Sequence, residues 1–443
     1  MPFSQLDASA LGRSLAQIAE APGDIVDLFL ERKEEVEVAT GRGVGGDDPG
    51  FVARREQGFA VRLVRDGSSW LAARDEFEQA DFEDALREVA RARPAMAYPG
   101  PKERGPVYSG PVVAPEVRAF PSQVERRIRA AHVAFPLLLT VQRCHRWVQV
   151  LGQRLVSEPE EELFYSARAD FSWGRYGALL PDLTERSAEH LASCLIAHFR
   201  AREGAVAPTG RQPLLLGSDA AAVLLHEAVA HTLEADTLIL TGRPEAACGF
   251  SLGSPLLDVL DDPGGAPTRV ARGFDDEGVP VLRRWLLRGG EVKEPLADLR
   301  FAAGSERLAP GAGRRSDRHS MPVPRSTHLE LLAGDTGESA LFAAARGGLF
   351  LPEASSGSLD PIAGRFSLSF PYGRRIGPDG PADYVGPCRL RGRVSEILEA
   401  VAAVGDEPRF GGAGWCAKAG LRMPVWATCP PVLVDGLSVE VSG

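Results

Sequence analysis

The sequence contains few lysines and no block of basic residues. Its four lysines, at positions 33, 102, 293 and 418, are scattered, and 60 acidic against 50 basic residues leave a formal net charge of −10 at pH 7. Proteins that bind nucleic acid need a concentrated basic surface to neutralise phosphate groups. The acidic balance, with no basic segment to offset it, therefore argues against a nucleic-acid partner.

Long apolar runs and clustered cysteines are also missing. The six cysteines are spread over the whole chain, unlike the compact disulfide frameworks of small secreted domains. The first 20 residues show the pattern of an amphipathic helix and lack the charged and apolar regions of an export signal. No apolar run reaches the roughly 20 residues of a membrane-spanning helix. We therefore expect a cytoplasmic protein that does not contact a membrane.

The chain of 443 residues is long enough for two or three domains. Strand-like alternation, as in Phe59, Val61 and Leu63, and helical periodicity alternate up to a Pro/Gly-rich stretch at Pro99–Pro121. Such a stretch is typical of an extended linker. Strand patterns with many Gly and Pro turns return after Asp236. We expect an α+β fold with an N-terminal α/β domain at 1–115, a central α/β segment at 116–210 and a β-rich C-terminal domain at 211–443.

The segment "GSDAAAVLLHEAVAHTLEAD" at Gly217–Asp236 contains two histidines and a glutamate among mostly apolar residues. Gly217 ends a short apolar strand, and Ser218 is a suitable N-cap for a helix that is apolar on almost every side. Such a helix belongs in a protein core, where polar groups must be paired. A lone core histidine is usually a structural residue. His226, Glu227 and His231 together instead favour a metal site.

The spacing of the two histidines does not fit a regular helix. Common zinc-peptidase helices space their histidines four residues apart, whereas His226 and His231 are five apart, which separates them by roughly 140° around an α-helix. Both rings can reach one metal only if the helix is distorted. We predict either a π-bulge between the two histidines or a helix that ends before His231.

Three carboxylates close to the histidines are candidates for roles in the site. Glu227 follows the first histidine directly, as in metallopeptidases where a glutamate takes a proton from the attacking water. Glu234 and Asp236 stand near the expected helix C-terminus, where the helix dipole disfavours acidic groups. They either accept hydrogen bonds from the ligand histidines or belong to an ordinary solvated helix end.

Several segments in order resemble the TldD/PmbA metallopeptidase family, also called modulators of DNA gyrase. "HEAVAHTLEAD" is similar to the metal-binding segment of that family, and "GFAVRLVRDGSSWLAA" is similar to its N-terminal strand pair. Further matches are "LLDVLDDPG" with "FDDEGVPV", "SSGSLDPIAGRFSLSF", and the Gly-x-Cys-x-Lys segment in "GGAGWCAKAGLRMPV". The resemblance covers essentially the whole chain.

The resemblance implies one zinc ion per chain, held by His226, His231 and Cys416, with Glu227 as the catalytic base. Two imidazoles and one thiolate leave a fourth coordination position open. It also implies a homodimer, or a heterodimer with a homologous subunit that lacks the metal motif. Ala417 replaces a glycine that is usual in the family, and Thr327 with His328 stand where an asparagine is typical. These departures concern substrate contacts more than metal binding.

The sequence therefore predicts a zinc-dependent peptidase that acts on short or unfolded polypeptides. Arg325 and His328 are the candidates for substrate binding, with a solvated basic loop as the alternative for the arginine region. A second possibility is a structural zinc site, closed by a fourth ligand such as Cys429, in a binding protein without peptidase activity. Direct contact with DNA or gyrase is suggested only by the older family name. "GRGVGG" at Gly41–Gly46 matches a dinucleotide-binding pattern, but no helix is expected after it, so we interpret it as a flexible loop.

Overall fold

The fold is described from a computed structural model of the chain. The Gly41–Gly46 loop lies outside the described residues. The structure describes residues 8–21, 23–40, 50–66, 68–91, 107–108, 114–152, 157–172, 174–242, 248–267, 269–303, 305–418 and 420–441.

A long antiparallel sheet is built from the first part of the chain. The strand order is β3-β2-β1-β5-β6-β7, and β4 pairs with β2. Phe59, Val61 and Leu63 are all buried on one face, as their alternation predicts, and pack with helices at one end of the sheet. The strands are β1 (Ile25–Thr40), β2 (Gly50–Arg65), β3 (Ser68–Arg74), β4 (Val107–Tyr108), β5 (Leu138–Gly152), β6 (Glu160–Phe171) and β7 (Gly174–Leu180).

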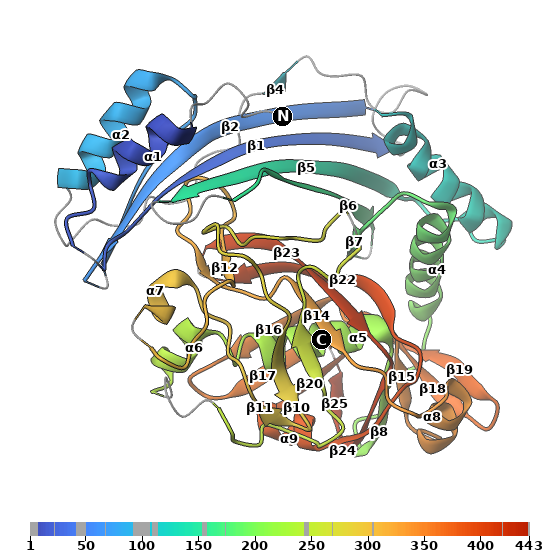
Figure 1. The fold of residues 1–443 in the computed structure, drawn as a ribbon. Coiled ribbons are helices and arrows are strands. Elements are labelled where there is room, and N and C mark those ends of the chain that lie inside the picture. Colours follow the sequence, from blue (N-terminus) through green and yellow to red (C-terminus); the bar gives the residue numbers. More distant parts are fainter. Residues whose placement is uncertain are drawn as a thin grey trace.

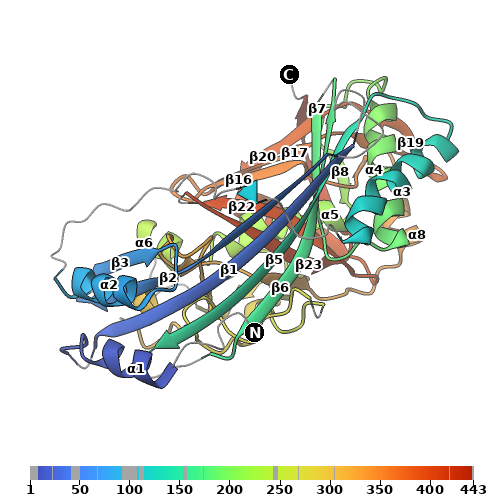
Figure 2. The same ribbon diagram turned by 90° about the horizontal axis from the view of Figure 1, so that it is seen from above.

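Four helices flank the two ends of this sheet (Figures 1 and 2). The helices α1 (Ala8–Ala16) and α2 (Gln79–Arg91) lie at one end, and α3 (Pro115–Ala130) and α4 (Glu185–Ala201) lie at the other. Helix α3 begins inside the Pro/Gly-rich stretch that we expected to be extended, because Pro115 fits the first turn of a helix, where no backbone N–H partner is needed. Strands from 1–115 and from 116–210 share the sheet, so both ranges contribute to one layer. The division into three segments stays a prediction.

The C-terminal part is rich in strands and lies below the long sheet (Figure 1). It contains sheets with the orders β11-β10-β9-β14-β23-β22, β19-β18-β15-β8-β24-β21, β16-β17-β20-β25 and β12-β13. Together with the N-terminal layer this confirms the α+β expectation. The strands are β8 (Gln212–Leu216), β9 (Val259–Asp261), β10 (Arg284–Arg288), β11 (Glu291–Val292), β12 (Gly313–Arg314), β13 (Val323–Pro324), β14 (His328–Leu331), β15 (Leu349–Leu351), β16 (Ser356–Asp360), β17 (Arg365–Phe370), β18 (Gly373–Gly377), β19 (Gly380–Val385), β20 (Cys388–Arg393), β21 (Val401–Val404), β22 (Arg409–Lys418), β23 (Leu421–Cys429), β24 (Val432–Leu437) and β25 (Val439–Val441).

The helices of the C-terminal part are short, and one of them lies in the middle of the sheets. Helix α5 and the π-helical turn η1 that follows it belong to the largest apolar cluster of the molecule, which also contains side chains from β8, β17 and β20. Burial of each Leu or Val side chain in such a cluster contributes about 1.5–3 kcal/mol. The helical segments are α5 (Ser218–Leu225), η1 (His226–Ala230), α6 (Ala235–Leu240), α7 (Leu299–Ala302), α8 (Glu338–Ala344) and α9 (Val394–Glu399).

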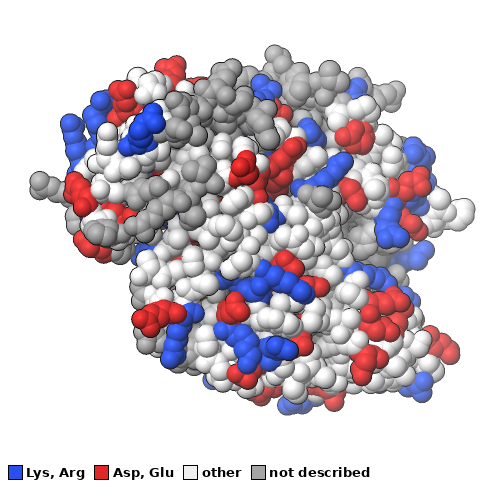
Figure 3. Space-filling model, in the orientation of Figure 1, with Lys and Arg blue, Asp and Glu red and all other residues white. Residues whose placement is uncertain are grey.

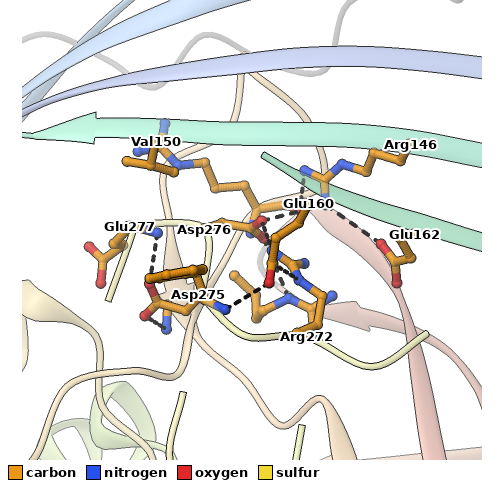
Figure 4. A network of polar contacts seen from close by, with 12 residues as sticks. Arg146, Val150, Glu160, Glu162, Arg272, Asp275, Asp276 and Glu277 are labelled. Atoms are coloured by element: carbon orange, nitrogen blue, oxygen red, sulfur yellow. Dashed lines mark hydrogen bonds and ion pairs between the residues drawn. The ribbon is translucent and has the colours of Figure 1, made fainter. Parts of the chain in front are cut away.

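A network of buried ion pairs joins the long sheet to the C-terminal part (Figure 4). Arg146 of β5 pairs with Glu31 of β1 at 2.8 Å and approaches Asp276 to 3.6 Å. Arg272 contacts the same Asp276 at 3.0 Å and Glu160 of β6 at 3.0 Å. Removal of one partner from such a buried pair leaves an uncompensated charge. The network therefore fixes the sheet over the C-terminal part.

On the face shown in Figure 3, basic side chains gather in small groups with acidic groups beside them. Within the described ranges, no helix combines the length and the apolar character that a membrane crossing requires.

Candidate metal centre

The two histidines lie where helix α5 changes into a π-helical turn. Gly217 is the N-cap of α5 and Ser218 is its first residue, so the expected capping role of Ser218 is wrong by one position. The amide of His231 donates to the carbonyl oxygen of His226 at 3.1 Å, which is the five-residue bond of a π-helix. The extra residue in this turn confirms the predicted distortion. It brings the two imidazole rings to a centroid distance of 4.3 Å.

Cys416 of strand β22 meets these two histidines. Its Sγ lies 3.5 Å from Nε2 of His231, and one ligand atom from each of His226, His231 and Cys416 lies within 4.8 Å of the others. Nitrogen and sulfur ligands at zinc distances of about 2.0 and 2.3 Å stand about 3.5 Å apart at a tetrahedral angle. The structure thus brings together the three predicted ligands at spacings that fit a zinc ion.

The surroundings of His226 also fit a metal ligand. Both ring nitrogens are buried and have no hydrogen-bond partner among the described residues. An unpaired polar atom in a protein interior costs about 1–3 kcal/mol. Burial, reinforced by the neighbouring His231, holds the pKa of His226 well below its usual range. The ring is therefore neutral, with a lone pair that a metal ion would satisfy.

Glu234 orients the second histidine. Its carboxylate is fully buried and lies 2.9 and 3.0 Å from Nδ1 of His231. Burial alone would lower the pKa of His231, but Glu234 and the thiol of Cys416 raise it to about 10. The Nδ1 proton is directed at Glu234, so a metal ion that displaces the proton on Nε2 would bind His231 through Nε2. Glu234 thus has the position of the predicted acceptor for a ligand histidine.

Asp236 and Arg325 occupy positions behind the metal cluster. Asp236 contacts no histidine and instead accepts from Lys418 at 3.2 Å and from Arg325 at 3.5 Å. Arg325 is only 1% exposed, and its guanidinium also contacts Glu234 at 3.3 Å. Our expectation that Arg325 binds substrate is not supported by this placement, because the side chain is enclosed and does not line the cavity described below.

His328 is likewise removed from the cavity. Its Nδ1 lies 2.9 Å from the carbonyl oxygen of Asp262, and its Nε2 lies 2.8 Å from Oγ1 of Thr428. Both ring nitrogens are therefore used within the C-terminal sheet, and the side chain is 3% exposed. The structure gives His328 a structural position, in contrast to the substrate contact that we expected.

Glu227 faces a large cavity in front of the metal cluster. Among the described residues its carboxylate has no hydrogen-bond or ion-pair partner, and burial raises its pKa above the usual range. Strand β16 packs closely against it, since a Cβ atom at Gly357 would lie 2.5 Å from Cγ of Glu227. Only glycine at this point leaves room for the glutamate. The result is an unpaired carboxylate beside the candidate ligands and open to the cavity.

The cavity has a volume of about 1600 Å³ and lies between the long N-terminal sheet and the C-terminal part. Strands β5, β6 and β7 and helix α4 form one wall. The other walls come from α5, η1, β16 and β22, with His226, Glu227, His231 and Cys416 at the surface. Both β16 and β22 are edge strands of their sheets. The cavity is large enough for an extended chain segment and has unpaired strand edges along it.

Cys429 and Lys418 complete the description of the site. Cys429, our example of a fourth ligand, lies on β23 and is not part of the cluster of His226, His231 and Cys416. Lys418 was not among the predicted site residues, although it contacts Glu234 and Asp236. The signal was present in the sequence, because Lys418 follows Cys416 by two residues, and such residues share one face of a strand.

Comparison with known sequences places residues 209–441 in the domain described as PmbA/TldA metallopeptidase C-terminal domain. The metalloprotease TldD homolog of Haemophilus influenzae is 30% identical over 239 residues, which cover 53% of this chain and 49% of that protein. A metalloprotease of Methanothermobacter thermautotrophicus is 31% identical over 237 residues, which cover 52% of this chain and 51% of that protein. The chain spans about half the length of the curated relatives it matches.

Solved structures resemble the fold over almost the whole chain. TldE from Thermococcus kodakarensis superimposes with a TM-score of 0.73 at 15% identity, covering 98% of this chain and 99% of that one. A putative modulator of DNA gyrase from Thermotoga maritima gives a TM-score of 0.71 at 19% identity, covering 98% of this chain and 100% of that one. At these identities the likeness concerns the fold alone.

Proposed function

Because the chain belongs to the PmbA/TldA metallopeptidase family, as the match over residues 209–441 shows, we propose that it is a zinc-dependent peptidase that cleaves short or unfolded polypeptides. The observation that carries this proposal is the convergence of His226, His231 and Cys416 beside the unpaired Glu227. Three protein ligands with one open position are typical of catalytic zinc, whereas structural zinc has four protein ligands. The cavity gives a substrate access to that position.

The roles of the residues follow from their positions. His226, His231 and Cys416 would hold the ion, which when bound supplies Lewis-acid polarisation of the scissile carbonyl and of the attacking water. Glu227 accepts a proton from that water, and its raised pKa makes it a stronger base than an exposed glutamate. The same carboxyl group then donates the proton to the amine that leaves. Glu234 keeps His231 in the tautomer that binds through Nε2.

The shape of the cavity supports an extended substrate. The ligands lie on a buried helix and on strand β22, so a scissile bond must enter the cavity to reach them. A folded domain cannot present its backbone at that depth, whereas an extended strand can pair with an exposed sheet edge such as β16. Pairing through the backbone recognises few side chains of the substrate, so we expect broad sequence specificity. We further propose that the protein acts as a homodimer or with a homologous subunit.

The decisive experiment measures metal and hydrolysis separately. The zinc content per chain is determined first, and degradation of an unfolded polypeptide is then followed with and without a chelator. We expect one zinc per chain and chelator-sensitive cleavage. Substrate form is tested with one small domain, compared in its native form and in a variant that is unfolded by destabilising substitutions. Zinc binding without any cleavage would instead favour a structural metal, and equal cleavage of the native form would contradict the extended-substrate proposal.

A further inference from the structure

Lys418 connects the two chain segments that carry the candidate metal ligands. It lies at the end of β22, two residues after Cys416, so strand alternation places both side chains on one face. Its ammonium group donates to the carboxylate of Glu234, to Asp236 at 3.2 Å and to Oγ1 of Thr237 at 2.8 Å. These three acceptors all belong to the segment that follows His231. One side chain therefore links the strand of Cys416 to the segment of His231.

The contacts of Lys418 leave it no capacity to bind a substrate. The side chain is 27% exposed and lines the cavity, which by itself would suggest a substrate contact. An ammonium group, however, has three hydrogen-bond donors and no acceptor. All three are directed at Glu234, Asp236 and Thr237. Lys418 consequently stabilises the site through these contacts and does not bind substrate.

Glu234 depends on this support because its carboxylate is fully buried. A buried carboxylate is strongly disfavoured unless charged or hydrogen-bonding groups surround it. Its partners are His231, Lys418 and the more distant guanidinium of Arg325 at 3.3 Å. Arg325 comes from a loop that carries no candidate ligand, whereas Lys418 is two residues from Cys416. Of these two cations beside Glu234, Lys418 is therefore the one that lies on a strand with a candidate metal ligand.

We propose that Lys418 is a positioning residue of the metal site. It holds the carboxylate of Glu234 so that the imidazole of His231 presents Nε2 to the metal, and it fixes β22 so that Sγ of Cys416 lies opposite. This inference rests on the proposed metal site and does not depend on peptidase activity. Substitution of groups that orient a metal ligand typically reduces metal affinity by 10- to 100-fold.

The test measures metal binding by the full chain with Lys418→Met and Lys418→Arg. Zinc affinity is determined by competition with a chromophoric chelator, and the absorption spectrum of the Co²⁺-substituted protein reports the coordination geometry. We expect a 10- to 100-fold loss of affinity and an altered cobalt spectrum for Lys418→Met. Lys418→Arg keeps a positive charge near Glu234. Its zinc affinity should therefore lie between that of Lys418→Met and that of the wild type. Circular dichroism and thermal unfolding of the metal-free proteins show whether each variant is folded.

Lys293→Met is the matched control, because Lys293 forms an exposed ion pair with Glu291 at 2.8 Å outside the metal site. It should bind zinc like the wild type. In a double-mutant cycle, Lys418→Met should add little to the loss caused by Glu234→Gln, since the lysine acts through the carboxylate. Wild-type affinity and cobalt spectrum in folded Lys418→Met would overturn the inference, as would fully additive losses in the cycle. A wild type that binds zinc without cleaving peptides would contradict the proposed peptidase while leaving this result interpretable.

Discussion

The amide of His231 donates to the carbonyl oxygen of His226 at 3.1 Å, and this single bond spans five residues. In a regular α-helix the two side chains would point roughly 140° apart. The π-helical turn takes up one additional residue, and both rings come to the same side of the segment. The five-residue spacing of the two histidines therefore requires a distorted turn if both rings are to bind one metal ion.

Glu227→Gln should retain zinc and lose hydrolysis. The carboxylate faces the cavity and is assigned to proton transfer, and loss of a general base typically reduces the rate by 10²- to 10⁴-fold. Metal content and peptide cleavage are measured on the same preparation. Glu338→Gln, at an exposed glutamate that lines the same cavity, is the control and should remain active. Loss of zinc from folded Glu227→Gln would show that Glu227 is itself a ligand.

Cys416→Ala should lower zinc occupancy sharply, whereas Cys429→Ala should keep both metal and activity. Cys416 belongs to the ligand cluster, and Cys429 is buried in the adjacent strand β23 without belonging to it. Zinc per chain is measured after dialysis against a weak chelator. An equal loss of zinc from both variants would mean that four protein ligands close the site, which is incompatible with the proposed catalysis.

Gly357→Ala should impair hydrolysis without removing the metal. The added Cβ would lie 2.5 Å from Cγ and 2.8 Å from Oε1 of Glu227, so the carboxylate must shift. A displacement of about 1 Å can cost 10²-fold in rate. The readouts are kcat and zinc content, with Gly210→Ala as the control, because a Cβ there meets no atom within 4 Å. Full activity of Gly357→Ala would show that the position of Glu227 is not critical.

The carboxyl group of Asp298 should make stability decrease as the pH rises from about 4 to 7. Burial, with a contribution from Glu277, raises its pKa to about 7, whereas an unfolded aspartate has a pKa of about 3.9. Between these values the folded state binds a proton that the unfolded state has lost, so rising pH favours unfolding. Asp298→Asn can still cap helix α7 and should flatten this dependence. Chemical denaturation at several pH values measures the unfolding free energy of both proteins. If it depends on pH with the same slope in the wild type and in Asp298→Asn, the raised pKa of Asp298 is refuted.

Asp276→Ala should destabilise the protein by about 3–5 kcal/mol, the usual cost of removing one partner from a buried ion pair. Burial would raise the pKa of Asp276, but Arg272, Arg146 and Arg314 hold it well below the usual range. The substitution leaves these buried cations uncompensated. Asp170→Ala, which removes a partly exposed partner of the exposed Arg168 and Arg175, should change the unfolding free energy by less than about 1 kcal/mol. Similar effects of the two substitutions would show that the network contributes little.

The sequence was sufficient for the parts of the site that depend on local pattern. The apolar helix, its distortion and the cluster of His226 and His231 follow from residue spacing within one segment, and Cys416 was identified through family resemblance. Contacts between distant segments were harder to predict from the sequence. Arg325 and His328 are polar residues in the sequence, yet the structure buries both of them. Arg325, directly after β13, contacts Glu234, and His328, the first residue of β14, contacts Thr428. The partners of a buried polar group are set by the tertiary fold and not by its neighbours in sequence.

The same limit applies to the fold. The alternation of Phe59, Val61 and Leu63 predicted a half-buried strand correctly. The Pro/Gly-rich stretch predicted an extended linker, but its last residues form the first part of helix α3. Pro115 starts this helix, and packing against α4 stabilises it. Nothing local indicates that strands on both sides of this stretch pair within one sheet. Strand pairing over such separations is determined by the burial of whole faces.

The place of strand β22 in the sequence determines when the metal site can form during translation. Cys416 follows His231 by 185 residues in the sequence. During translation both histidines emerge long before the thiol that meets them, and β22 must pair with β23 before the three ligand atoms can converge. A growing or prematurely terminated chain therefore lacks the complete ligand set. The order of synthesis therefore delays assembly of the metal centre until the 185 residues that separate Cys416 from His231 have been made.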